Sequence, residues 1–134
     1  MHYPNLTTVE QWRTSRLKSF SHAFKGVIFN LKHEPNFFIQ LIFAVLVISA
    51  GIVFPISKSE WLVLIIAIGG VLSAEAMNTA IEKVCDRFVE GHDALVKIIK
   101  DSAAAAVLIM ALTAAVAGII VFLPYLLESV GISR

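Results

Sequence analysis

Charge is scarce in this sequence: only 16% of its 134 residues are Asp, Glu, Lys or Arg, whereas 57% are hydrophobic. Mean hydropathy is +0.80, far above the need of a water-soluble domain of this size. The formal charge of +1 gives no support for a nucleic-acid partner. A single cysteine, Cys85, excludes an internal disulfide and a cysteine-based metal cluster. The sequence therefore predicts one membrane domain over residues 1–134 and excludes a soluble multidomain enzyme.

Three long segments are almost free of charge. Residues 35–57 contain no charged residue, 61–81 contain only Glu75, and 102–127 contain none. Each is long enough for a helix that crosses a hydrocarbon core, which takes roughly 20 residues. An all-α membrane protein is predicted. Its expected transmembrane helices cover 36–57, 61–89 and 97–127, with the second extended into the cytoplasm.

Residues 10–34, ahead of the first span, have the pattern of an amphipathic helix lying in the membrane interface. Apolar side chains from Leu17 to Leu31 recur every three to four residues, with basic and polar residues between them. Pro35 ends this helix and makes Glu34 a corner. Three thin spans enclose a site poorly, and the third span is rich in small residues that let helices approach closely. A homo-oligomer is therefore expected.

Basic residues predict the orientation of the spans. Those before the first span are Arg13, Arg16, Lys18, Lys25 and Lys32, and those between the second and third are Lys83, Arg87, Lys97 and Lys100. Segments rich in Lys and Arg stay on the cytoplasmic side. The N-terminus and the connection between the second and third spans are therefore expected in the cytoplasm, and the C-terminus outside.

Polar residues form a stripe along one face of the second predicted helix. Its members are Glu75, Asn78, Thr79, Glu82 and Asp86, which fall within about 100 degrees of the helix surface and rise by about 16 Å. An ionised Glu among apolar residues costs several kcal/mol, so such residues usually face a bundle interior and mark a site. Stacked like charges also require cations opposite them. The stripe therefore predicts a site with a counter-cation.

The residue types suggest separate roles along this stripe. Glu34 and Glu82 are expected near the cytoplasmic boundary, where two carboxylates and phosphate oxygens suit Mg2+. Glu75 lies deeper and suits a general base for a hydroxyl proton. Lys100, at the start of the third span, could meet a carboxylate or a phosphate. No P-loop or protein-kinase motif is present.

Structural readings of the same residues stay open. Glu82 and Asp86 are also compatible with a solvated helix end, Glu75 with a buried structural carboxylate, and Asn78 with an interhelical hydrogen bond. The pattern alone indicates a carboxylate-rich intramembrane site near the cytoplasmic face. It does not decide between phosphoryl transfer and translocation of protons or ions.

The segment Glu75-Ala-Met-Asn78-Thr-Ala-Ile-Glu82-Lys-Val-Cys-Asp86 resembles the signature of the small prokaryotic diacylglycerol kinases, a family that includes the undecaprenol kinases. The order of amphipathic helix and three spans, and the stretch Lys100-Asp101-Ser-Ala-Ala-Ala-Ala-Val, look like that family too. The resemblance implies a lipid kinase that uses ATP and Mg2+. The enzyme would lie in the inner (cytoplasmic) membrane of a bacterium. The resemblance also implies a homotrimer with sites between protomers.

The resemblance further implies a role for each matched residue. Glu75 takes the place of the catalytic base, Asn78 supports it, and Glu34 and Glu82 hold the magnesium of the nucleotide. The positions matched to nucleotide binding are His22, Asp86, Gly91, His92, Asp93, Lys100 and Asp101. The positions matched to lipid binding are Arg16, Lys25 and Asn36.

The acceptor lipid and two other functions remain as hypotheses. The stretches 23–27 and 120–124 look more like the undecaprenol kinase branch than the diacylglycerol branch, whose product is phosphatidic acid. A small homo-oligomeric transporter coupled to protons or cations would also use Glu75, but it would need access from both sides and would depend less on Glu34, Glu82 and Lys100. A non-catalytic membrane scaffold would need none of these residues.

Overall fold

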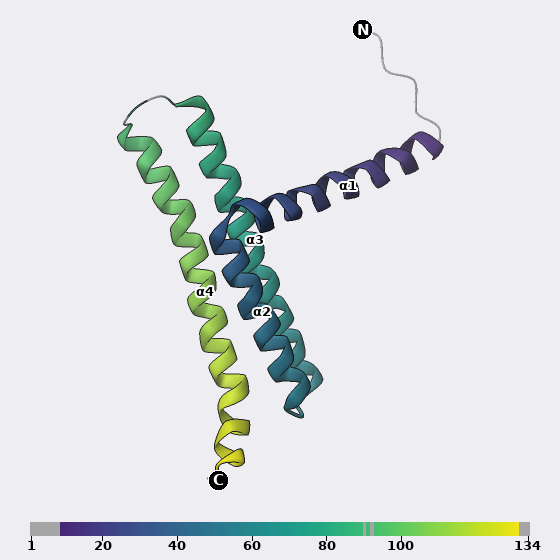
Figure 1. Cartoon of the computed structure of the whole chain (residues 1–134), viewed down its shortest axis with the longest axis vertical. Helices are drawn as coiled ribbons and strands as arrows, with labels where there is room; N and C mark the ends of the chain where they lie inside the picture. Colours follow the sequence, from purple (N-terminus) through teal and green to yellow (C-terminus); the bar gives the residue numbers. More distant parts are fainter. Residues whose placement is uncertain (1–8, 90, 92, 132–134) are drawn as a thin grey trace.

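The chain folds into helices alone in the part that the structure, a computed structural model, describes: residues 9–89, 91 and 93–131, with side chains from Lys18 onward. The helices are α1 (Val9–His33), α2 (Pro35–Val53), α3 (Lys58–Phe88) and α4 (Ala94–Ser129). Figure 1 shows α2, α3 and α4 running alongside one another, with α1 leaving from the upper end of α2, and with α3 and α4 extending beyond that level. The predicted all-α class is confirmed.

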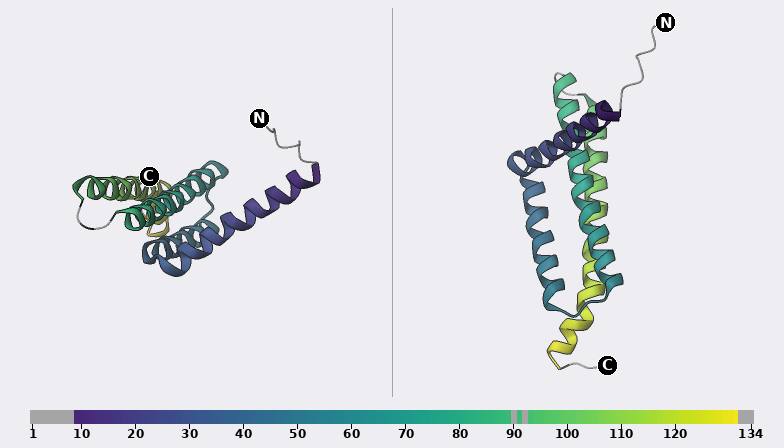
Figure 2. Two further views of the ribbon diagram at one scale, coloured as in Figure 1. Left: turned by 90° about the horizontal axis from the view of Figure 1, so that it is seen from above. Right: turned by 90° about the vertical axis from the view of Figure 1, so that its right-hand side faces the viewer.

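Three of these helices, α2, α3 and α4, are long and apolar enough to cross a membrane. This confirms the prediction of three spanning helices. α3 and α4 form the most extensive contact, α2 packs on α3, and α1 extends sideways from the bundle in the view from above (Figure 2). The polar end of α3 therefore lies at the same end of the bundle as α1.

The corner between α1 and α2 has a local cause. Glu34 has an extended backbone, with φ −114° and ψ 104°. The ring of Pro35 disfavours the helical conformation of the residue before it, so α1 ends at His33. Pro35 itself starts α2, because the first turn of a helix needs no N–H from it. The corner places the Glu34 carboxylate at the junction of α1 and α2.

The opposite end of the bundle is a short, hydrogen-bonded turn. α2 ends at Val53, so the predicted end of the first span at residue 57 is too late. The reason is that Pro55 follows and cannot continue the helix. Ser57 then caps α3 through a capping box: the Glu60 N–H donates to Ser57 Oγ, and the Ser57 N–H donates to Glu60 Oε2 at 2.7 Å. The Tyr125 hydroxyl donates to Glu60 Oε2 at 3.0 Å, which ties α4 to this turn.

Few apolar side chains are buried within one chain. Among the described side chains, the buried apolar ones are Phe37, Ala44, Leu64, Cys85 and Val121. Large aliphatic and aromatic side chains are exposed along all of α2, α3 and α4. Such a surface is unfavourable in water but compatible with lipid tails or with another copy of the chain.

We expect Gly51→Ala to lower stability by about 1–3 kcal/mol, because the added methyl would overpack a well-filled contact. A Cβ at Gly51 would lie 2.8 Å from Cη2 and 2.9 Å from Cζ2 of the rigid Trp61 ring. Thermal unfolding in detergent measures the effect. Gly26→Ala is the matched control, since a Cβ there meets nothing within 4 Å. If Gly51→Ala is as stable as Gly26→Ala, the packing argument is wrong.

Candidate active site

The polar stripe of α3 runs from the bundle interior to its surface. Glu75, Asn78 and Thr79 are buried, with exposed fractions of 4%, 7% and 5%. Glu82 is half-buried, and the side chain of Asp86 is 61% exposed. Because the helical spacing puts these residues on one face, the stripe connects an apolar interior to a polar end of the bundle.

Hydrogen bonds hold the buried part of the stripe. Gln40 of α2 donates from Nε2 to Glu75 Oε2 at 3.0 Å. Asn78 donates from Nδ2 to Glu82 Oε1 at 3.2 Å, one helical turn further along. A buried carboxylate without a partner would be strongly unfavourable, so Gln40 is the contact that accommodates Glu75. Asn78 in turn orients the carboxylate of Glu82.

An ion pair brings the α1–α2 corner to the stripe. Lys83 Nζ lies 3.0 Å from Glu34 Oε1, and the Glu34 side chain is 16% exposed whereas that of Lys83 is 55% exposed. The contact is not aligned as a hydrogen bond, so Glu34 Oε1 is a buried oxygen without a hydrogen-bond partner. Lys83 follows Glu82 in the sequence, and the pair therefore places Glu34 at the level of Glu82. The Lys83 ammonium therefore lies against the Glu34 carboxylate and neutralises it.

A second ion pair joins α4 to the exposed end of the stripe. Lys100 donates from Nζ to Asp86 Oδ1 at 2.8 Å. Asp101 points elsewhere on α4 and pairs loosely with Lys97 at 3.9 Å, both side chains being largely exposed. Exposed pairs of this kind contribute little to stability. Lys100 and Asp86 are thus brought together, whereas Asp101 is placed beside them without contacting the stripe.

The connection between α3 and α4 supplies the next predicted residues. Gly91 has φ +87°, a left-handed conformation that favours glycine in a tight turn. Asp93 caps α4, with its Oδ1 accepting from the Leu95 N–H at 2.8 Å and the Val96 N–H at 3.2 Å. His92 lies outside the described residues. The Asp93 carboxylate therefore already serves the start of α4.

The remaining predicted residues lie on α1 and at the start of α2. His22 and Lys25 are exposed on α1, and Asn36 is exposed in the first turn of α2. Arg16 belongs to α1, but its side chain is outside the described part. The hydrogen bonds and ion pairs found between described side chains include none from His22, Lys25 or Asn36 to the α3 stripe.

The sequence reasoning missed two amides, the buried Asn30 and the half-buried Gln40. Asn30 is 8% exposed on α1, and its Oδ1 has no partner. The Oε1 of Gln40 and the Oδ1 of Asn78 are also buried acceptors without a partner. Buried acceptors are normally hydrogen-bonded, so these three need donors from a ligand, from water or from another chain. The available signal was that Gln40 is the only amide in the apolar run 37–56.

Magnesium fits the donor set of Glu34 and Glu82. Both are carboxylates, which magnesium prefers, and Glu34 Oε1 is buried without a hydrogen bond. Across the described residues, no group of three or more His, Cys, Asp or Glu side chains is arranged to hold a metal ion. The two carboxylates alone would leave most of the coordination sites of the ion to other oxygen ligands.

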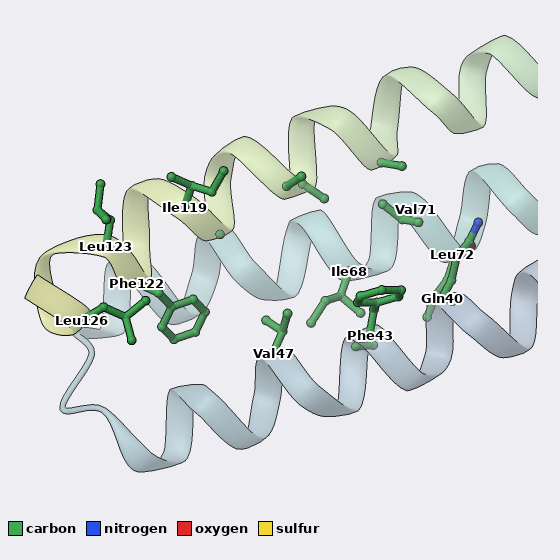
Figure 3. A pocket seen from close by; sticks show the side chains of 15 residues that line it. Gln40, Phe43, Val47, Ile68, Val71, Leu72, Ile119, Phe122, Leu123 and Leu126 are labelled. Atoms are coloured by element: carbon green, nitrogen blue, oxygen red, sulfur yellow. The ribbon is translucent and has the colours of Figure 1, made fainter.

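An apolar cavity of about 530 Å³ lies between α2, α3 and α4 (Figure 3). On α4 its wall consists of the small residues Ala111, Ala114, Ala115 and Gly118, which leave space where tight helix packing was expected. Gln40 is the only side chain in the lining that can form a hydrogen bond. The other lining residues are aliphatic or aromatic. The cavity therefore meets the polar stripe at Gln40, next to Glu75.

Comparison with known proteins places this chain in a family. A sequence model described as prokaryotic diacylglycerol kinase matches residues 21–122, which include the stripe, the corner at Glu34 and the start of α4. An undecaprenol kinase from Bacillus subtilis is 38% identical over 109 residues, covering 81% of this chain and 89% of that protein. A diacylglycerol kinase from Synechocystis is 37% identical over 113 residues, covering 84% of this chain but 65% of that protein. The chain therefore belongs to the prokaryotic diacylglycerol kinase family, whose members are membrane phosphotransferases with an alcohol group as acceptor.

Proposed function

We propose that this protein is an ATP-dependent kinase that transfers the terminal phosphoryl group of ATP to the hydroxyl of a membrane lipid. The observation that carries the proposal is the change in burial and charge along α3, in a chain of this family. A buried carboxylate at Glu75 is continuous with a charged cluster of Glu82, Asp86 and Lys100 at the bundle end. A lipid alcohol can reach the buried part from the bilayer, and a soluble nucleotide can reach the charged part from water.

Glu75 is the proposed catalytic base. The lipid hydroxyl oxygen attacks the terminal phosphorus, the bond from that phosphorus to the bridging oxygen of ATP breaks, and ADP leaves. The hydroxyl proton passes to Glu75. Phosphoryl transfer depends mostly on positioning and on neutralising charge, so a fixed carboxylate beside the acceptor oxygen is the chief contribution from the buried stripe. Asn78 supports the site by orienting Glu82.

Glu34 and Glu82 are the proposed ligands of Mg2+, which neutralises phosphate charge when it is bound. In the structure the Lys83 ammonium pairs with the Glu34 carboxylate. Lys83 therefore has to move away before Glu34 can bind Mg2+. Its exposed side chain permits the movement. Lys100 is proposed to release Asp86 in a similar way and to contact the phosphates, since its ammonium lies at the charged end of the stripe. The other proposed nucleotide contacts are His22, Asp86, Gly91, His92, Asp93 and Asp101.

Undecaprenol is the proposed acceptor ahead of diacylglycerol. The support is that the match to a protein named undecaprenol kinase covers 89% of its length, against 65% for the one named diacylglycerol kinase. Arg16, Lys25 and Asn36 are proposed to contact the lipid near its polar end. Arg16 and Lys25 lie on α1 and Asn36 lies at the start of α2, where the Lys25 and Asn36 side chains are exposed.

The proposed assembly is a homotrimer in the inner membrane of a bacterium, with α1 lying amphipathically in the interface. The N-terminus and the α3–α4 connection are placed in the cytoplasm and the C-terminus outside, on the distribution of Lys and Arg. Support for self-association comes from the exposed apolar side chains of α2 to α4 and from the three buried acceptors without partners. A neighbouring protomer would cover the exposed apolar side chains and supply donors to the buried acceptors.

We expect Glu75→Gln to lower lipid-dependent ATP turnover roughly 100-fold or more, because the amide cannot accept the hydroxyl proton. The measurement is magnesium-dependent ATP consumption by purified protein in mixed micelles containing undecaprenol, diacylglycerol or no added lipid. Glu128→Gln is the matched control, since the same change lies at the opposite end of α4 from the stripe and is exposed. Wild-type turnover in Glu75→Gln would contradict the assignment of the base. Absence of turnover with either lipid in a folded wild-type oligomer would instead favour the transporter hypothesis.

We expect Lys100→Met to raise the KM for ATP at least about tenfold, which corresponds to about 1.4 kcal/mol of lost binding. The reason is that the ammonium next to Asp86 is the proposed partner of the phosphates. Initial rates at varied ATP and saturating lipid measure the change. Lys58→Met, the same substitution at the exposed start of α3, should leave the KM unchanged. Equal KM values for both variants would exclude Lys100 from the nucleotide site.

A further inference from the structure

Gln40 is placed at an unfavourable position for an amide. It lies in the apolar helix α2, where an amide without full hydrogen bonding costs several kcal/mol relative to an apolar side chain. Its Nε2 donates to Glu75 Oε2 at 3.0 Å, but its Oε1 is buried with no partner. A residue selected for stability alone would have both ends of its amide satisfied or would be apolar. The unpaired acceptor indicates another role.

The surroundings of Gln40 show what that role can be. Gln40 is the only hydrogen-bonding side chain in the lining of the apolar cavity, and it is also the residue that contacts the Glu75 carboxylate. In Figure 3 its amide reaches from α2 toward α3 at one end of the cavity. An apolar chain in the cavity would therefore bring a polar group to this amide and to Glu75 together.

We propose that Gln40 is a positioning residue for phosphoryl transfer, which holds the Glu75 carboxylate by one oxygen and leaves the other oxygen to the acceptor hydroxyl at the end of the apolar cavity. This inference rests on the proposed kinase function and deepens it. The Nε2 of an amide only donates, so Gln40 fixes Glu75 without competing for the proton that Glu75 accepts. Its own Oε1 offers a second acceptor to donors entering the site.

The geometry explains why the contact affects the chemical step. A carboxylate on a flexible Glu side chain can rotate away from a hydroxyl, and a displacement of about 1 Å at a reacting group can cost about 100-fold in rate. The nucleotide groups lie further along α3 and on α4, at Glu82, Asp86 and Lys100, and none of them contacts Gln40. Loss of the contact should therefore change transfer to the lipid and leave nucleotide binding intact.

The test replaces Gln40 by methionine, which has nearly the same shape and no strong hydrogen-bonding group. We expect Gln40→Met to lower kcat for lipid phosphorylation at least about tenfold while the KM for ATP stays unchanged. The amount of phosphorylated lipid formed per ATP consumed should also fall, because a misplaced hydroxyl allows transfer to water instead. Gln40→His, which keeps an N–H donor at this position, should recover part of both losses.

A stability measurement and a control variant separate a catalytic effect from a folding defect. Thermal unfolding in detergent shows whether Gln40→Met damages the fold. Ser49→Ala is the matched control on α2, because the Ser49 hydroxyl bonds only to Val45 O in its own helix. Loss of kcat and coupling with unchanged unfolding supports the proposal. Wild-type kcat and coupling in Gln40→Met, or a loss that parallels unfolding and raises the KM for ATP as well, overturns it. A folded wild-type protein without lipid-dependent turnover overturns the kinase function and this inference together.

Discussion

The structure depends on accommodating one carboxylate inside an apolar bundle. Glu75 is buried on a helix that is apolar enough to span a membrane, and an unpaired charge there would be strongly unfavourable. The amide of Gln40 on α2 satisfies it, at the cost of placing a second polar group in the same interior. The packing of α2 on α3 thus does more than bury apolar surface: through Gln40 it brings an acidic group to the end of an apolar cavity.

The charged end of the bundle follows a different physical logic. Its carboxylates are neutralised by lysines, Glu34 by Lys83 and Asp86 by Lys100, and both lysines have long side chains that can be displaced. The pair of Lys100 and Asp86 is substantially exposed and contributes little to stability, so its loss to an incoming nucleotide would cost little. The Glu34 carboxylate is mostly buried, so another cation would have to replace Lys83 there. A site held by replaceable ion pairs is suited to a ligand that carries both negative charge and a divalent cation.

The two halves of the site are joined by the geometry of α3. One uninterrupted helix carries Glu75, Asn78, Glu82 and Asp86 on a single face, so the distance between the buried and the charged halves is fixed by helical rise alone. The contacts from other elements then differ in kind: an uncharged amide from α2 at the buried half, and charged side chains from the α1–α2 corner and α4 at the other. This division matches a reaction between a lipid alcohol and a water-soluble phosphate donor, and it explains why a transporter with access from both sides is the weaker reading.

The sequence by itself determined the elements and most of the chemistry. Apolar runs define the spanning helices, Pro35 defines the corner at Glu34, and helical periodicity puts the stripe residues on one face, since all three are local properties of the chain. The pairing of Lys83 with Glu34, the hydrogen bond from Gln40 to Glu75 and the small residues of α4 lining a cavity are different. They depend on which faces of separate helices meet and in what register, which no local pattern specifies, and only the tertiary structure decided them.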